Sequence, residues 1–508
     1  MMFDFDESLK LASWAADFSQ HLAREDVEQA LPVATKALEQ GDARGKAVAY
    51  SAIARAHLLE REFLKAVEAA QKGVQAAQGD AVAMAERTAA KAYLAVFRLD
   101  EAAEAADKAV SAAQGPAQAA ALTTRAQVCL ARDKKQEAAK VARQAAALFK
   151  EQKEQQGEAA ALEVLVRACL ATKKGGDALR AANEVLAIYQ GSASANEARG
   201  LLLVAKTKQA LGDSQEAQEL AQNAVDIFDK NGDRLMQGIM LKQLADICLA
   251  GGENIDGWQY TRAALECFRD VGHKRGEAAT LCQIAAAHVE TGVLEEALRI
   301  ADEGVEICRQ RNDRPQLGAT LNVIASAHVG QLRLARSDQQ EQQTNWKARL
   351  AGKEAMAVLQ SVGDRVGEAQ ALKSLATAFL NYGNAAEARA KAKLAIEIAK
   401  EVGNKQIEGE NLLLVAQTKI HENKEEGARL ARMSEKLLRE AGASSAARNA
   451  GDVYDFIRDY GAAPKESKKD KPKMEADTKT DITVDVEENK HRLSYFHGFT
   501  ARSVRPRA

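Results

Sequence analysis

The sequence of 508 residues contains few of the residues that interrupt helices or build mixed cores. It has 6 prolines, and aromatic residues make up 5% of the chain. Ala, Leu, Glu, Gln, Lys and Arg dominate instead, and these residues have the highest helix propensities. The length would allow several domains. The composition therefore predicts an all-α protein.

An excess of charge of either sign is also missing. The chain has 70 Lys and Arg against 72 Asp and Glu, a formal net charge of -2. This balance creates no global field that would attract nucleic acid or an anionic membrane, so neither is expected as a partner. No apolar stretch approaches the ~20 residues that span a bilayer. The first eight residues lack the basic and apolar regions of a signal peptide. We expect a soluble, cytoplasmic protein, with cytoskeletal association left open.

Cysteines are few, and no two of them form a CxxC motif. All lie in helical patterns, and three take the same repeat position in place of a larger packing residue. We expect small buried apolar side chains in a reducing compartment, with a metal or redox site as the less favoured alternative. The six are Cys129, Cys169, Cys248, Cys267, Cys282 and Cys308.

Recognisable catalytic motifs are absent from the sequence. It contains no P-loop, no dinucleotide-binding GxGxxG after a strand, no HExxH and no GxSxG. The 8 histidines are scattered, and His57, His288 and His328 repeat one packing position. Most carboxylates are spaced four residues from Lys or Arg, a pattern typical of solvated helix faces. We therefore expect no enzyme activity, no cofactor and no metal site.

What the chain does contain is an internal repeat. A small residue recurs early in the second helix of each predicted pair, at intervals of 36, 36, 36, 40, 39, 40, 40, 51, 40 and 40 residues. A fixed period in this range predicts a helical solenoid of stacked helix-turn-helix units. The eleven positions are Ala30, Ala66, Ala102, Ala138, Ala178, Ala217, Gly257, Ala297, Ala348, Ala388 and Ala428.

The repeats divide the chain into segments. Residues 7–150 have the 36-residue period, residues 151–330 the 40-residue period, and residues 347–442 continue the repeats after an insertion at 331–346. The insertion is expected to extend the flanking helices, either as tolerated decoration or as a docking element. Residues 443–460 predict a capping helix. The highly charged residues 461–508 predict a disordered tail, which is either inert or carries a docking motif around Tyr495, Phe496 and Phe499.

One unit carries the pattern especially clearly, and it resembles a tetratricopeptide (TPR) repeat. Glycine-containing linkers such as residues 272–278 resemble those of the 40-residue branch, which includes Pins/LGN-type adaptors and, more loosely, kinesin light chains. The resemblance covers residues 7–460 and implies an α-solenoid of about 11 repeats, with a concave groove lined by the first helix of each unit. The residues that carry it are Leu281, Ile284, Ala285, His288, Gly292, Glu296, Ala297 and Ala301.

The resemblance also implies which side chains face the groove. Transferring the register of groove residues onto this chain selects a cation-rich first half and a mixed second half. Arg and Lys in the first half predict an extended peptide ligand rich in Asp, Glu or phosphate, although solvated surface cations remain the alternative. The selected residues are Arg55, Arg87, Lys91, Gln127, Arg167, Lys206, Lys242, Asn322 and Lys373.

Two functions stay open at this point. The first is a non-catalytic protein-protein interaction scaffold that holds a peptide in the groove. The second is a regulatory or targeting subunit, an adaptor for an enzyme, a motor, or a cytoskeletal or ciliary complex. A further alternative is that the tail folds back into the groove and inhibits binding.

Overall fold

A computed structural model describes residues 14–23, 27–191, 194–251, 254–332, 334–335, 337–420 and 422–459. The tail at 461–508, with Tyr495, Phe496 and Phe499, lies outside these residues. The chain divides into two compact units. Unit 1 comprises residues 1–291, 296–320 and 357–365; unit 2 comprises residues 292–295, 321–356 and 366–508.

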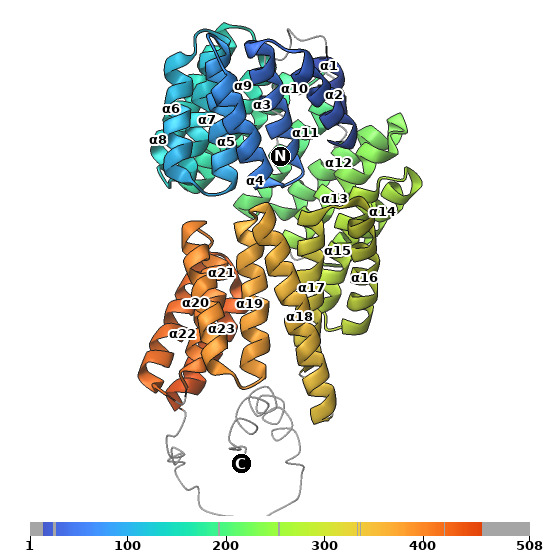
Figure 1. Ribbon diagram of the computed structural model, residues 1–508, viewed down its shortest axis with the longest axis vertical. Helices are drawn as coiled ribbons and strands as arrows, with labels where there is room; N and C mark the ends of the chain where they lie inside the picture. Colours follow the sequence, from blue (N-terminus) through green and yellow to red (C-terminus); the bar gives the residue numbers. More distant parts are fainter. Residues whose placement is uncertain are drawn as a thin grey trace, which may run out of the picture. The chain divides into compact units, whose positions relative to one another are not determined.

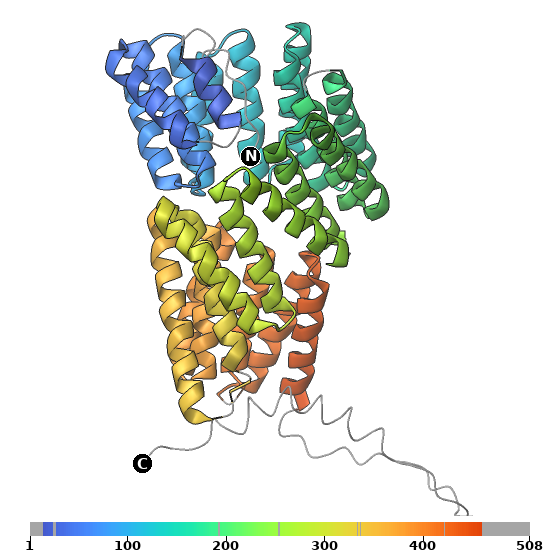
Figure 2. The same ribbon diagram turned by 90° about the vertical axis from the view of Figure 1, so that its right-hand side faces the viewer.

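The described residues form 23 α-helices joined by short turns (Figures 1 and 2). Helices α1 to α15 lie in unit 1, α20 to α23 lie in unit 2, and α16 to α19 contribute residues to both. In order, they are α1 Ala15–Ala23, α2 Val27–Gln40, α3 Ala43–Leu59, α4 Phe63–Ala76, α5 Ala81–Ala95, α6 Leu99–Ala112, α7 Pro116–Ala131, α8 Lys135–Glu151, α9 Gln155–Ala171, α10 Gly175–Tyr189, α11 Ser194–Leu211, α12 Ser214–Asn231, α13 Arg234–Gly251, α14 Asn254–Asp270, α15 Lys274–Glu290, α16 Leu294–Arg311, α17 Arg314–Leu332, α18 Asp338–Val362, α19 Arg365–Asn381, α20 Ala385–Glu401, α21 Lys405–Thr418, α22 Lys424–Glu440 and α23 Ser444–Asp459.

Consecutive helices pack in pairs, as in α3 with α4, α13 with α14 and α21 with α22. The repeated small residue lies where the two helices of a pair approach each other. Ala66, Ala138 and Ala217 are 0% exposed, and Ala388 is 1% exposed. At Gly257 a Cβ would lie 2.7 Å from Leu249 Cγ, so a methyl group there would require the Leu249 side chain to shift. The predicted all-α solenoid of TPR-like repeats is confirmed.

Residues in the left-handed backbone conformation follow the ends of many helices. Gly232, Gly272 and Gly403 each have φ near +68°, a conformation that is open to glycine without a Cβ clash. The backbone N–H of Gly232 reaches the carbonyl of Asp229 in the last turn of α12. These glycines therefore separate one helix from the next. Other turns use the same conformation without glycine, at Arg61, Phe97, Asp133, Lys153, Lys173 and Asn312.

The insertion contributes mainly to one long helix. A break follows Leu332, and α18 then runs for 25 residues from Asp338. Within unit 2, the buried Asn345 side chain donates a 2.8 Å hydrogen bond to the carbonyl of Ala378. The Arg349 guanidinium lies 4.8 Å from the ring centre of Tyr382. These contacts fix the start of α18 to the end of α19, while Trp346 stays 56% exposed.

Unit 1 also contains contacts between residues far apart in sequence. The Arg275 guanidinium donates a 2.7 Å hydrogen bond to the carbonyl of Leu59, 216 residues earlier. Arg61 forms an ion pair with Asp364, 303 residues later, and the Asp364 side chain is 4% exposed. The turn between α3 and α4 is thus held by residues from much later repeats.

Helix α23 covers the apolar face of the last repeat. Val453 and Ile457 are buried with Leu413 and Leu438 in one cluster. In the described part of the chain, each helix is too short or too polar to cross a lipid bilayer. Five cysteines are buried and Cys282 is half-buried. The described residues contain no group of three or more acidic, His or Cys side chains arranged to hold a metal ion.

Candidate functional site

Within each unit, we call the surface formed by the odd-numbered helices the odd-helix face. In unit 1, consecutive odd-numbered helices from α3 to α13 pack against each other, and in unit 2, α21 packs against α23. Each odd-numbered helix from α3 to α21 is the first of its pair, the one predicted to line the groove. Side chains spaced four apart on one of these helices point to the same side.

All nine predicted groove residues lie on odd-numbered helices. Arg55 is on α3, Arg87 and Lys91 are on α5, Gln127 is on α7, Arg167 is on α9, Lys206 is on α11, Lys242 is on α13, Asn322 is on α17 and Lys373 is on α19.

Side-chain hydrogen bonds connect neighbouring odd-numbered helices in a regular register. In unit 1, Lys206 Nζ donates to Gln243 Oε1 at 2.5 Å, and Gln283 Nε2 donates to Asp246 Oδ1 at 2.7 Å. Both bonds join residues 37 positions apart. This spacing is three residues shorter than the 40-residue repeat, so the two bonded residues are offset by about one helical turn from equivalent repeat positions.

The same register appears in unit 2. Lys373 Nζ donates to Glu410 Oε2 at 2.6 Å, again across 37 positions. Beside it, Ser374 Oγ donates to Asn322 Oδ1 at 3.0 Å, and the hydroxyls of Ser374 and Ser326 lie 3.2 Å apart. Lys206, Asn322 and Lys373 therefore each bond to a side chain on the next odd-numbered helix of the same unit.

The cations of unit 1 differ in how far they are accessible. Arg87 is 5% exposed, so it offers little surface to a ligand although its charge contributes to the local field. Arg55 and Lys91 are half-buried, whereas Arg167 and Lys206 are exposed. The accessible positive charge therefore lies on α9 and α11.

The side chains of Arg167 and Lys206 are exposed, yet nearby protein atoms partly desolvate their charged groups. Desolvation by the surrounding protein lowers the pKa of Arg167, an effect that Glu163 partly opposes. Desolvation also lowers the pKa of Lys206, and Asp246 and Glu163 oppose this shift. In the described ranges, neither cation has a carboxylate within 4.0 Å.

The odd-helix face of unit 2 contains a pocket of about 300 Å³ between α19, α21 and α23. We call it the α23 pocket. Its lining includes the predicted Lys373, and the other residues are Thr377, Leu380, Asn381, Glu410, Leu413, Leu414, Gln417, Leu438, Ala446 and Asn449. Sequence reasoning missed the contribution of α23, because residues 443–460 were assigned a capping role alone.

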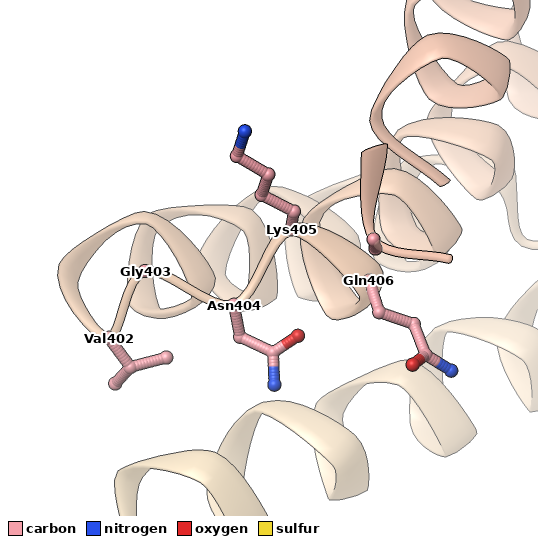
Figure 3. A pocket seen from close by; sticks show the side chains of 6 residues that line it. Val402, Gly403, Asn404, Lys405 and Gln406 are labelled. Carbon is pink, nitrogen blue, oxygen red and sulfur yellow. The ribbon is translucent and has the colours of Figure 1, made fainter. Parts of the chain in front are cut away.

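A second hollow, of about 420 Å³, lies at the turn between α20 and α21 (Figure 3). Its polar side chains already have structural roles. Asn404 Oδ1 accepts a hydrogen bond from the N–H of Ile407, and Lys405 forms an ion pair with Glu440 at 2.6 Å. Gln406 donates to Glu410 at 3.0 Å. This hollow is a surface feature of the turn and offers no comparable set of groups for a ligand.

Comparisons with known proteins give limited matches. No family model matches the chain. The regulatory protein AfsR of Streptomyces griseus is 34% identical over 111 residues, which are 22% of this chain and 11% of that protein. The chain thus spans about a tenth of this relative's length.

Among solved structures, a Rap protein complexed with competence and sporulation factor is 12% identical over 68% of this chain and 98% of its own, with a TM-score of 0.40. A STAND protein with a TPR sensor from Pyrococcus horikoshii is 12% identical over 77% of this chain and 55% of its own, with a TM-score of 0.43. The quorum sensor NprR of B. thuringiensis is 15% identical over 67% and 97%, with a TM-score of 0.39. The helix pairs of this chain are TPR-like repeats.

Proposed function

We propose that the chain is a non-catalytic interaction scaffold that binds an extended peptide rich in Asp, Glu or phosphate on the odd-helix face of unit 1. The observation that carries this proposal is the pair of exposed cations Arg167 and Lys206 on consecutive odd-numbered helices, neither of which forms an ion pair with a carboxylate among the described residues. An anion placed beside them would favour their charged forms and offset the cost of their desolvated surroundings.

The surface suits an extended ligand better than a compact one. Its polar groups recur from helix to helix at the repeat spacing, so successive residues of a peptide would meet equivalent positions. A guanidinium can bind a carboxylate or phosphate through two parallel hydrogen bonds, which favours Arg167 as the main anchor. Lys206 adds a point charge, and its bond to Gln243 holds it in place.

A second candidate is a regulatory or targeting subunit that works in the cytoplasm. The similarity of 111 residues to a protein named as a regulator supports it. The resemblance of the linkers to Pins/LGN-type and kinesin-light-chain adaptors would extend it to motors or cytoskeletal complexes. In this role the odd-helix face would still be the contact surface, and the chain would serve an enzyme without being one.

The test uses fluorescein-labelled dodecapeptides of alternating Glu and Ser, with Gln-Ser and Lys-Ser versions as comparisons. Binding to the full chain is measured by fluorescence anisotropy at several salt concentrations. We expect the Glu-Ser peptide to bind most tightly, with affinity that falls as salt rises. The substitutions Arg167→Glu and Lys206→Glu should each weaken binding about tenfold or more.

Matched controls come from the even-numbered helices. Lys140 on α8 and Arg262 on α14 are exposed cations outside the odd-helix face. Lys140→Glu and Arg262→Glu change the net charge equally but should leave the affinity almost unchanged. Equal binding of the Glu-Ser and Gln-Ser peptides would overturn the proposal, and so would equal losses in the control variants.

A further inference from the structure

The α23 pocket has an aliphatic floor. Leu413 and Leu438 are buried, and Leu380 and Leu414 are half-buried. Ala446 contributes a small side chain from α23, which leaves the space open on that side. A floor of this kind favours an apolar group over a charged one, because burying an unpaired charge is costly.

Amide side chains line the pocket beside this floor. Asn381, Gln417 and Asn449 come from α19, α21 and α23 respectively. Within the described residues, the side-chain amides of these three residues form no hydrogen bond and no ion pair. Each carries both donors and an acceptor, so together they can pair with the N–H and C=O groups of a peptide backbone.

The charges around the pocket cancel. Lys373 Nζ lies 2.6 Å from Glu410 Oε2, and the two side chains are 37% and 21% exposed. Among the residues that the structure describes, no other ionisable side chain lines the pocket. The pocket is therefore neutral, in contrast to the cationic surface of α9 and α11.

The volume limits the occupant. An apolar cavity of roughly 150 Å³ can hold a benzene molecule. The α23 pocket, at about 300 Å³, can take one branched aliphatic side chain with the backbone next to it. It is at the lower end of the range for ligand pockets, about 300–1,000 Å³, and too small for a larger ligand body.

We propose that the α23 pocket binds one aliphatic side chain, Leu, Ile, Val or Met, of an extended peptide whose backbone pairs with the amides of Gln417 and Asn449. This inference deepens the proposed function and rests on its claim that the odd-helix face binds extended peptides. Helix α23 is then a wall of a binding site as well as a cap. The ligand segment that it predicts at this pocket is uncharged.

The experiment selects peptides from a phage-displayed library of random dodecapeptides on the immobilised full chain. The selection is repeated with Ala446→Phe, which fills the pocket, and with Asn449→Asp, which places a negative charge at an exposed rim position. Ala390→Phe is the matched control, because Ala390 is an exposed alanine on α20 outside the pocket. Circular dichroism of each variant checks that the helices are retained.

We expect the wild-type chain and Ala390→Phe to enrich peptides with an aliphatic residue at one fixed position. That enrichment should vanish with Ala446→Phe and fall with Asn449→Asp. A synthetic copy of one selected peptide should bind about tenfold or more weakly when its aliphatic residue is replaced by Ser. Aliphatic enrichment that persists in Ala446→Phe would overturn the pocket assignment.

The same selection separates this inference from the proposed function. Enrichment of Asp and Glu without a fixed aliphatic position would support the cationic surface and overturn the pocket. A fixed aliphatic position without acidic enrichment would support the pocket and overturn the acidic ligand. A synthetic peptide of residues 491–500 serves as competitor. If it displaced the selected peptides from the wild-type chain, the occupant of the pocket would be the chain's own segment 491–500. That result would overturn the proposal that a peptide of another protein binds there.

Discussion

Lys373 on α19 and Glu410 on α21 form a 2.6 Å ion pair at the edge of the α23 pocket, and this pair keeps the pocket neutral. Glu410→Gln removes the negative partner and leaves the ammonium facing the pocket. We expect a selected peptide with Asp at the anchor position to gain affinity in this variant, by about tenfold relative to the wild-type chain. The aliphatic peptide should change less.

The contribution of the Lys373–Glu410 ion pair to the stability of the fold can be measured separately. Because both side chains are partly exposed, the coupling energy from a double-mutant cycle of Lys373→Ala and Glu410→Ala should be small, about 0.2–1 kcal/mol. Hydrogen exchange of α19 and α21 amides would report it. A coupling of several kcal/mol would contradict this view of the pair as a screened surface interaction.

Gly276, near the start of α15, is packed too closely to accept a side chain. A Cβ at this position would lie 2.6 Å from Phe268 Cδ1 and 2.7 Å from His273 Nδ1. We predict that Gly276→Ala destabilises this repeat by about 1–3 kcal/mol through overpacking. Hydrogen exchange of the α15 amides would measure the loss.

Gly304 on α16 is the matched control for that substitution. The nearest atom to a Cβ there would be Thr320 Cγ2 at 3.5 Å, an ordinary contact. Gly304→Ala should be neutral or stabilise by about 0.5–1 kcal/mol, because it removes flexibility from the unfolded chain. Similar losses in the two variants would show that crowding at Gly276 is not the cause.

His57 gives the repeat of α3 and α4 a dependence on pH. Burial, together with the positive charge of Lys65, lowers its pKa below the usual 6.5, while Glu62 and Glu68 oppose the shift. The unfolded chain therefore binds the proton more readily than the folded one. This contribution to stability is complete above pH 6.5 and falls as pH drops from 6.5 to the folded pKa.

The measurement is hydrogen exchange of α3 amides between pH 7.5 and 5.5, corrected for the intrinsic pH dependence of exchange. We expect protection to fall with pH in the wild-type chain and to fall less in His57→Gln. His288, an equivalent position in a later repeat, supplies a comparison through His288→Gln. An unchanged pH response in His57→Gln would remove this histidine as the source.

The cysteines should react slowly with alkylating reagents in the folded protein. Burial raises the pKa of the Cys282 thiol, and that of Cys308 is raised to about 12, so little thiolate forms at pH 8. Cys282 is half-buried on α15, whereas the other five are buried. Iodoacetamide labelling followed by mass spectrometry should modify Cys282 first, and more slowly than free cysteine. Rapid labelling of any of the six would contradict the packing role predicted for them.

The repeat period made much of the fold predictable. A small residue at a constant interval can be recognised in a sequence because each helix pair needs close approach at the same point. The turns at Gly232 and Gly272 could be predicted for a similar reason. Those at Phe97 and Lys153 could not, since their left-handed residues have ordinary side chains.

For the candidate site, only the assignment of residues to the odd-helix face could be predicted from the repeat register. Transfer of the repeat pattern placed Arg167 and Lys206 on the odd-helix face, but the burial of Arg87 depends on neighbouring helices and cannot be seen in one sequence. Asn449 was missed for a related reason. It lies on a helix outside the repeat pattern, and it lines the pocket only because α23 packs beside α21.

The ion pair between Arg61 and Asp364 sets an order of events during synthesis. Ribosomes add about 5–20 residues per second, so Asp364 follows Arg61 by roughly 15–60 seconds. Repeats stacked on their neighbours can fold during that time, because each of them contacts mainly the next one. Until then, the turn at Leu59 and Arg61 lacks the later residues that bind it in the folded unit. Of all parts of unit 1, this turn is therefore accessible for the longest time to a chaperone or protease acting on the growing chain.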